Sequence, residues 1–174
     1  MMVDLPDTPL RGAYWVRPGR LLAGPYPGAA AHDRAMERLR AVLATGVTFF
    51  LDLTEAGELR DYRLDAQTLA AAEARRVQHR RMPIQDMDVP TRAHMADTLD
   101  TLDNALAEGH VVYVHCLGGI GRTGTVIGCW LARHGMDGSA ALAALVQLRG
   151  GDTGSPETAE QRLMVASWQE DAAL

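Results

Sequence analysis

The sequence predicts an α/β fold with a central, mixed and largely parallel sheet of about five strands, flanked by helices. Two observations predict it. Short apolar runs rich in β-branched and aromatic residues alternate along the chain with longer segments of helical periodicity. One of these runs, Val111–Val114, is apolar without interruption, which is typical of a strand covered on both faces.

The first half of the chain contains most of the predicted strands. Met36, Leu39 and Leu43 recur at helical spacing, and Gly46 follows as a helix-ending residue. We expect small edge strands at 13–16 and 21–23 around a Pro-Gly turn, a helix at 30–44, a buried strand at 47–53, an alanine-rich helix at 65–76, a strand at 77–82 and a loop at 83–90.

The second half is mainly helical. Thr91 can cap a helix whose apolar face carries Leu99, Leu102 and Leu106. A strand at 110–115, a glycine-rich turn and helices at 122–134 and 140–148 follow. After a linker at 150–155, Pro156 suits the first position of a final helix that runs to about residue 171.

Length and composition predict a single domain over residues 1–174. A net charge of −5 gives no indication of nucleic-acid binding. No apolar run is long enough to cross a bilayer, and residues 1–20 lack a signal-peptide core, so we expect a cytoplasmic protein without a membrane partner. Cys116 and Cys129 are not spaced as a disulfide pair, and Cys129 is expected in the core.

The segment from His115 to Gly124 reads as a strand, a glycine turn and a helix. Glycines allow the backbone N–H groups of such a turn to converge on one anion, and the helix behind it adds its positive end. Phosphate is the ligand best suited to this arrangement. The predicted phosphate-binding residues are Leu117, Gly118, Gly119, Ile120, Gly121 and Arg122.

Cys116 stands at the first position of this turn, where an electropositive site favours the nucleophilic thiolate. Arg122 can reach across the turn, and its planar fork matches two phosphate oxygens. Three alternatives stay open: a dinucleotide-binding turn, since residues 119–124 also fit G-x-G-x-x-G, a glycine turn with an incidental cysteine, and a phosphate-binding module without turnover.

The string HCLGGIGRTG resembles the signature of the protein tyrosine phosphatase superfamily, in particular its small dual-specificity branch of kinase-associated and Cdc14-type enzymes. WVRPGRLLAGPYPG, FFLDLTEAGEL, PIQDMDVPT and SPETAEQ are similar to segments of small bacterial and plant members. The resemblance covers most of the chain, from about Tyr14 to Trp168. It implies the compact dual-specificity phosphatase fold and a phosphocysteine intermediate.

The resemblance also implies roles for individual residues. Cys116 is the nucleophile and Arg122 binds the phosphate. The general acid falls at Asp86 in the PIxD segment, with Asp88 as the fallback. Thr123 assists the departing thiolate, and His115 supports the cysteine from beneath the loop. No metal and no cofactor are expected, since the histidines lack ligand spacing.

Two assignments stay open. Larger relatives position the hydrolytic water with a glutamine in a QTxxQ-like segment, but Glu157 replaces the first glutamine here, and Gln161 is the candidate that matches the second. Asp52 and Glu55 follow a buried strand, where they could brace the phosphate loop or cap a neighbouring segment.

Together these features predict a cysteine-dependent phosphomonoester hydrolase. Its expected partner is a phosphorylated protein or peptide carrying phosphotyrosine, or phosphoserine and phosphothreonine. Inositol phosphates or phosphoinositides are the alternative, which is disfavoured because the loop from Leu117 to Gly121 has no basic side chain. The sequence does not fix the oligomeric state.

Overall fold

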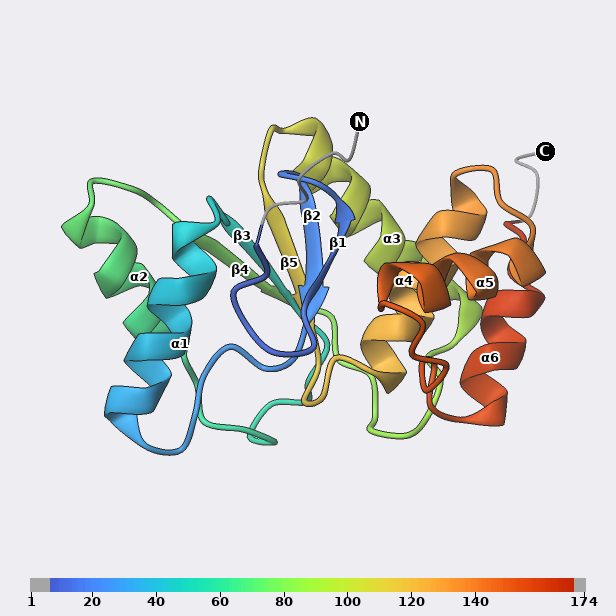
Figure 1. The fold of residues 1–174 in the computed structure, drawn as a ribbon, viewed down its shortest axis with the longest axis horizontal. Helices are drawn as coiled ribbons and strands as arrows, with labels where there is room; N and C mark the ends of the chain where they lie inside the picture. Colours follow the sequence, from blue (N-terminus) through green and yellow to red (C-terminus); the bar gives the residue numbers. More distant parts are fainter. Residues whose placement is uncertain (1–6, 171–174) are drawn as a thin grey trace.

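The structure is a computed structural model that describes residues 7–170. Its centre is a five-stranded sheet with the order β1-β2-β5-β3-β4 (Figure 1). The strands are β1 (Tyr14–Arg17), β2 (Leu21–Gly24), β3 (Phe49–Asp52), β4 (Gln78–Arg81) and β5 (Val112–His115). β1 pairs antiparallel with β2 and all other pairs are parallel, which confirms the predicted mixed sheet.

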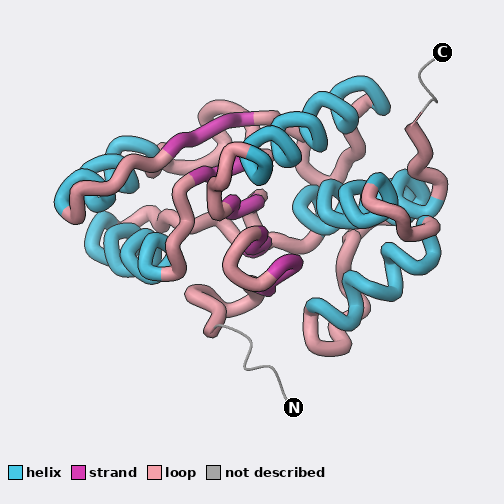
Figure 2. The backbone as a smooth tube through the Cα atoms, turned by 90° about the horizontal axis from the view of Figure 1, so that it is seen from above, coloured by secondary structure: helices cyan, strands magenta, loops and turns pink. Residues whose placement is uncertain are grey.

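Helices cover both faces of this sheet (Figures 1 and 2). One face carries α1 (His32–Ala44) and α2 (Arg63–Ala72), and the other carries α3 (Arg92–Ala107), α4 (Gly121–Arg133), α5 (Gly138–Leu148) and α6 (Ala159–Ala166). As predicted, the Thr91 hydroxyl caps α3 by accepting a hydrogen bond from the backbone N–H of His94. None of the described helices has both the length and the apolar character needed to cross a membrane.

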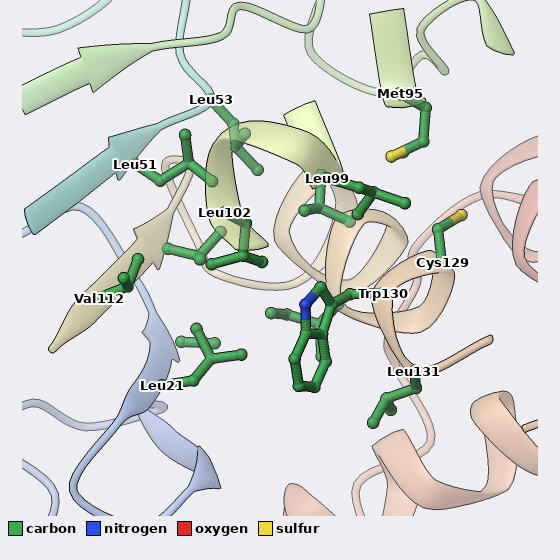
Figure 3. Packing of buried hydrophobic residues seen from close by; sticks show 14 of the residues in the cluster. Leu21, Leu51, Leu53, Met95, Leu99, Leu102, Val112, Cys129, Trp130 and Leu131 are labelled. Carbon is green, nitrogen blue, oxygen red and sulfur yellow. The ribbon is translucent and has the colours of Figure 1, made fainter. Parts of the chain in front are cut away.

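Each face of the sheet has its own hydrophobic core. The larger core lies under α3 to α6, where Leu99, Leu102 and Trp130 are buried (Figure 3). Cys129 lies in this core, as predicted, and burial raises the pKa of its thiol to about 12. The smaller core lies under α1 and α2.

Three sequence-based expectations are wrong. The alanine-rich helix expected at 65–76 ends at Ala72, and Ala74, with a φ of +55°, has left the helical conformation. The segment at 21–23 is an interior strand, because β2 pairs with β5 on one side and β1 on the other, and all four of its residues are buried. The final helix begins at Ala159 rather than Pro156, because Thr158 supplies the N-terminal cap. It ends at Ala166, and the predicted end near residue 171 lies outside the described residues.

Parallel pairing brings three strand ends to one edge of the sheet. In this register Gly24 of β2 and Asp52 of β3 flank His115 of β5. The loops that follow these strands therefore start side by side, at the edge to which the strand arrows point in Figure 1. Ligand sites of open α/β sheets form at such an edge.

Candidate active site

In the turn between β5 and α4, residues 116–121, three backbone carbonyl oxygens accept hydrogen bonds from segments that surround the turn. Tyr26 N–H donates to the Leu117 carbonyl (2.9 Å), Arg149 Nη1 to that of Gly119 (3.2 Å) and Ser155 Oγ to that of Ile120 (2.6 Å). The C=O and N–H of one trans peptide point in opposite directions. The N–H groups of Gly118, Ile120 and Gly121 therefore face inward, as an anion cradle requires.

Gly119 is the position of this phosphate loop that admits no side chain. Its φ is +72°, and a Cβ atom there would lie 2.4 Å from the carbonyl carbon of Gly24. At Gly118, by contrast, a Cβ would meet only the Ile120 side chain, at 3.6 Å. The loop can therefore pack against the end of β2 only because residue 119 is glycine.

Cys116 is only 3% exposed, but it lines a pocket of about 180 Å³. The Thr123 hydroxyl donates a hydrogen bond to its Sγ over 3.1 Å. Thr123 lies in the first turn of α4 and is fully buried, so the bond is shielded from water. A threonine in a helix often donates its hydroxyl to a backbone carbonyl of the same helix, whereas the Thr123 hydroxyl donates to the cysteine sulfur.

Arg122 is buried beside the same pocket and is held by three groups. Nη1 donates to Glu58 Oε2 (2.8 Å) and to the Ile84 carbonyl (3.0 Å), and Nη2 donates to Glu58 Oε1 (2.6 Å). Asp86 Oδ1 lies 3.3 Å from Nη2. The Nε–H has no hydrogen-bond partner among residues 7–170, so Arg122 retains a donor for a bound anion.

Glu58 was not singled out by the sequence analysis, which considered Asp52 and Glu55 as braces. Hydrogen bonds from Arg122 hold the pKa of Glu58 below its usual value. Glu55 accepts no bond from Arg122; instead its N–H donates to Glu58. The segment FFLDLTEAGEL contains both glutamates, but only the folded turn shows which of them reaches the arginine.

Asp52 lies beneath the loop and is buried among donors. Its carboxylate accepts hydrogen bonds from Thr54, from His79 Nε2 (2.9 Å) and from Arg81 Nη2 (3.0 Å). Burial opposes its charge, but the bonds from His79 and Thr54 and the nearby His115 together lower its pKa. Asp52 thus anchors the floor of the site without touching the pocket.

His115 sits between Asp52 and the phosphate loop. Its Nδ1 lies 3.0 Å from the Cys116 carbonyl, which can only accept, and its Nε2 lies 2.6 Å from the Tyr62 hydroxyl. Nδ1 therefore carries the proton and Nε2 accepts from Tyr62. Burial lowers the pKa of His115 to about 4, although the Asp52 carboxylate opposes this shift. The imidazole is neutral at pH 7 and braces the loop without adding charge.

Two aspartates lie in the loop at residues 83–90, but only one lines the pocket. Asp86 lies at the pocket wall beside Arg122, whereas Asp88 is not among the lining residues and its carboxylate accepts from Val89 N–H. The lining residues are Asp86, Met87, Cys116, Leu117, Gly118, Ile120, Gly121, Arg122 and Glu157.

Gln161 and Glu157 differ in how they meet this site. Gln161 is fully buried, and its amide oxygen accepts from the N–H groups of Glu157 and Thr158, both at 3.0 Å. Its Nε2 donates to the Asp88 carbonyl. The Glu157 side chain is exposed, lines the pocket and has no hydrogen-bond donor among the described residues.

The sequence of this chain matches the model of a known protein family. The model described as "Polymorphic toxin system, DSP-PTPase phosphatase" matches residues 27–136, more than half of the chain, including Asp86 and the loop from Cys116 to Arg122. The chain belongs to this DSP-PTPase family. The chain is thus a member of the dual-specificity branch of the cysteine-dependent phosphatases, which confirms the resemblance seen in the sequence.

Solved structures share the fold of this chain. Tk-PTP in its active form is 28% identical over 88% of this chain and 92% of its own, with a TM-score of 0.70. Kinase associated phosphatase is 23% identical over 83% of each chain, with a TM-score of 0.68. PTPMT1 in complex with PI(5)P is 22% identical over 85% of this chain and 88% of its own, with a TM-score of 0.64.

Curated relatives match a shorter stretch. The uncharacterized protein MJECL20 of Methanocaldococcus jannaschii is 38% identical over 56 residues, which is 32% of this chain and 38% of the relative. The uncharacterized protein MJ0215 of the same organism is 36% identical over 55 residues, or 35% of its length. The match thus spans little more than a third of these relatives.

Proposed function

We propose that this protein hydrolyses phosphomonoesters of proteins or peptides through a phosphocysteine intermediate. One observation carries the proposal: Cys116 Sγ, bonded by Thr123, shares a small pocket with inward N–H groups and the unpartnered Nε–H of Arg122. A nucleophile and the donors for three phosphate oxygens thus meet in one place.

In the first step the Cys116 thiolate attacks phosphorus. The S–P bond forms, the P–O bond to the leaving group breaks, and a proton from Asp86 goes to the leaving oxygen. Asp86 pairs with Arg122 Nη2 in the structure, at 3.3 Å. Phosphate oxygens compete for the same donor, so a bound substrate releases the Asp86 carboxyl from Arg122.

In the second step water attacks phosphorus and the S–P bond breaks. Asp86 accepts the proton of the water, and the Thr123 hydroxyl donates to the departing Cys116 thiolate. The loop N–H groups and Arg122 bind the equatorial oxygens in both steps. The cycle as proposed uses side chains, the loop N–H groups and water.

The pocket favours a substrate with one phosphate group. Its volume of about 180 Å³ is below the range of roughly 300–1,000 Å³ for whole small-molecule ligands, so the phosphate enters and the rest of the substrate stays outside. Leu117 (49% exposed) and Met87 (52% exposed) give the wall apolar surface that suits an aromatic ring. Among the described residues that line the pocket, Arg122 is the one with a cationic side chain, whereas Asp86 and Glu157 are acidic.

We therefore place phosphotyrosine first, with phosphoserine and phosphothreonine next. A phosphoinositide or inositol phosphate would bring further phosphates to a wall that offers carboxylates instead of cations. These remain the alternative substrates.

Substrate trapping tests the proposal. Reduced wild-type protein is expected to release phosphate from p-nitrophenyl phosphate and from a phosphotyrosine peptide, and more slowly from an inositol polyphosphate. Cys116→Ser is expected to bind the peptide without turnover. Acid quenching of wild-type reactions with ³²P-labelled peptide should leave label on Cys116. Binding without any phosphate release by wild type would instead identify a binding module.

A further inference from the structure

The turn that carries Asp86 holds a backbone conformation that it would not keep by itself. Met87 has a φ of +64°, in the left-handed region that disfavours side chains other than those of Gly, Asn and Asp. The turn has one local bond between backbone groups, from Asp88 N–H to the Gln85 carbonyl (3.2 Å), and a short bond from Met87 N–H to Asp86 Oδ1 (3.0 Å). Both Asp86 and Met87 are exposed. Contacts from outside the turn must therefore fix it.

Buried side chains hold this turn on both sides of Met87. On one side Arg122 Nη1 donates to the Ile84 carbonyl over 3.0 Å. On the other side Gln161 Nε2 donates to the Asp88 carbonyl over 3.2 Å. Arg122 belongs to the phosphate loop, whereas Gln161 comes from the first turn of α6 and bonds nothing on the substrate side.

Hydrogen bonds at the start of α6 fix the position of the Gln161 side chain. It is fully buried, and its own N–H donates to the Thr158 hydroxyl oxygen in a capping box. Both lone pairs of its amide oxygen are used by the N–H groups of Glu157 and Thr158. It also packs against Gly121, where a Cβ would lie 3.0 Å from Oε1 and 3.1 Å from Nε2.

We propose that Gln161 is a positioning residue for the proton donor: its amide nitrogen holds the Asp88 carbonyl and thereby places Asp86 over the phosphate loop. Its oxygen has no free lone pair with which to orient the hydrolytic water, which was the role considered from the sequence. This inference rests on the proposed function, since it concerns the step in which Asp86 protonates the leaving oxygen.

Dependence on the leaving group is the signature of this role. When the P–O bond breaks, a phenolate that is a poor leaving group needs the proton from Asp86 more than p-nitrophenolate does. A displaced Asp86 therefore slows phenyl phosphate more than p-nitrophenyl phosphate. General damage to the site would slow both substrates alike.

The test variant is Gln161→Glu, because glutamate can still accept the two capping N–H groups but cannot donate to the Asp88 carbonyl. We expect kcat for phenyl phosphate to fall about tenfold or more, the effect of one lost hydrogen bond, and KM to stay nearly constant. The fall for p-nitrophenyl phosphate should stay within about threefold. Gln161→Met, which has a similar volume and no donor, is the second variant and should show the same selectivity.

Thr158→Ala is the matched control, because it removes the helix cap and leaves the bond from Gln161 to Asp88 in place. It should lower the melting temperature without any dependence on the leaving group. Equal losses for both substrates in the Gln161 variants, or no loss, would overturn the inference. If wild type itself turns over neither substrate, the proposed function fails instead.

Discussion

Glu58 accepts hydrogen bonds from both terminal nitrogens of Arg122, at 2.8 and 2.6 Å. The pair holds the guanidinium in one orientation while its Nε–H stays available to a ligand. An arginine with two charge-assisted bonds of this kind is more strongly oriented than one held by neutral groups. Glu58 therefore acts on phosphate binding through Arg122, although Glu58 does not line the pocket.

Removing this carboxylate should impair phosphate binding and catalysis. We expect Glu58→Ala to lower kcat/KM for an aryl phosphate by about tenfold or more, because charge-assisted bonds to a buried guanidinium are lost. Glu55→Ala is the matched control and should stay within about twofold, since Glu55 gives Arg122 no bond. Steady-state kinetics on the two variants measure this difference, and equal effects would contradict the assignment of Glu58.

The two aspartates of the loop at residues 83–90 should differ in the same way. Asp86 lines the pocket, whereas the Asp88 carboxylate bonds Val89 N–H. Asp86→Asn should lower kcat for phenyl phosphate by about 10²-fold or more, the usual contribution of a general acid. Asp88→Asn should change it by less than about threefold. Comparable small effects of both substitutions would remove Asp86 from the mechanism.

The Thr123 hydroxyl should matter most when the thiolate departs. Thr123→Val keeps the volume but removes the donor to Cys116 Sγ. We expect an initial burst of nitrophenol, followed by turnover about tenfold slower than in wild type, because the phosphocysteine then breaks down slowly. Thr125→Val removes a buried hydroxyl that bonds only the Gly121 carbonyl and should show no burst. Stopped-flow absorbance resolves the two phases.

Neighbouring glycines in the phosphate loop should tolerate alanine differently. Gly119→Ala puts a Cβ 2.4 Å from the Gly24 backbone at a positive φ, so the loop must move. We expect a loss of about 1 kcal/mol or more in the free energy of unfolding and a fall of tenfold or more in kcat/KM. Gly118→Ala meets nothing closer than 3.6 Å and should leave stability nearly unchanged. Urea titrations and initial rates give both quantities.

Stability should fall on mild acidification because of His115. The pKa of this imidazole is about 4 in the folded protein, against 6.5 as a usual value, mainly because it is buried. Between these two values the unfolded chain binds a proton that the folded chain excludes, so the free energy of unfolding decreases as the pH falls. Over the whole interval from pH 6.5 to 4, the free energy of unfolding falls by about 3 kcal/mol.

Urea denaturation at several pH values from 7.5 to 4.5 measures this dependence. His115→Gln should flatten the curve between pH 6.5 and 4, because no imidazole remains to exclude the proton. Asp52 adds a separate loss at lower pH, since its pKa is held below the usual range. A wild-type curve that is flat from pH 6.5 to 4.5 would contradict a buried neutral His115.

The sequence was most informative where the site is contiguous. Cys116, Arg122 and Thr123 lie within eight consecutive residues, so a strand, a glycine turn and a helix suffice to predict that they meet. The choice of Asp86 as the candidate acid needed the family resemblance, and in the structure Asp86 lines the pocket. Strand and helix types were also predicted correctly, because the hydrophobic periodicity is clear.

What the sequence could not show depends on pairing between distant segments. Tyr62 and Glu58 reach His115 and Arg122 across more than fifty residues, and no local pattern marks them. The interior place of β2 follows from its pairing with β5, some 90 residues later in the chain. The water-positioning role considered for Gln161 came from its match to the QTxxQ-like segment of larger relatives, whereas the use of both its amide atoms is a tertiary feature.

Burial of Cys129 has a practical consequence. The chain has two cysteines, both free, and the pKa of the Cys129 thiol is about 12, so at neutral pH this sulfur does not react with electrophiles. Cys116, by contrast, lines a pocket that a small reagent can enter. A limiting amount of iodoacetamide therefore acts as an active-site titrant: one carbamidomethyl group per chain, blocked by vanadate, counts the competent enzyme molecules in any preparation.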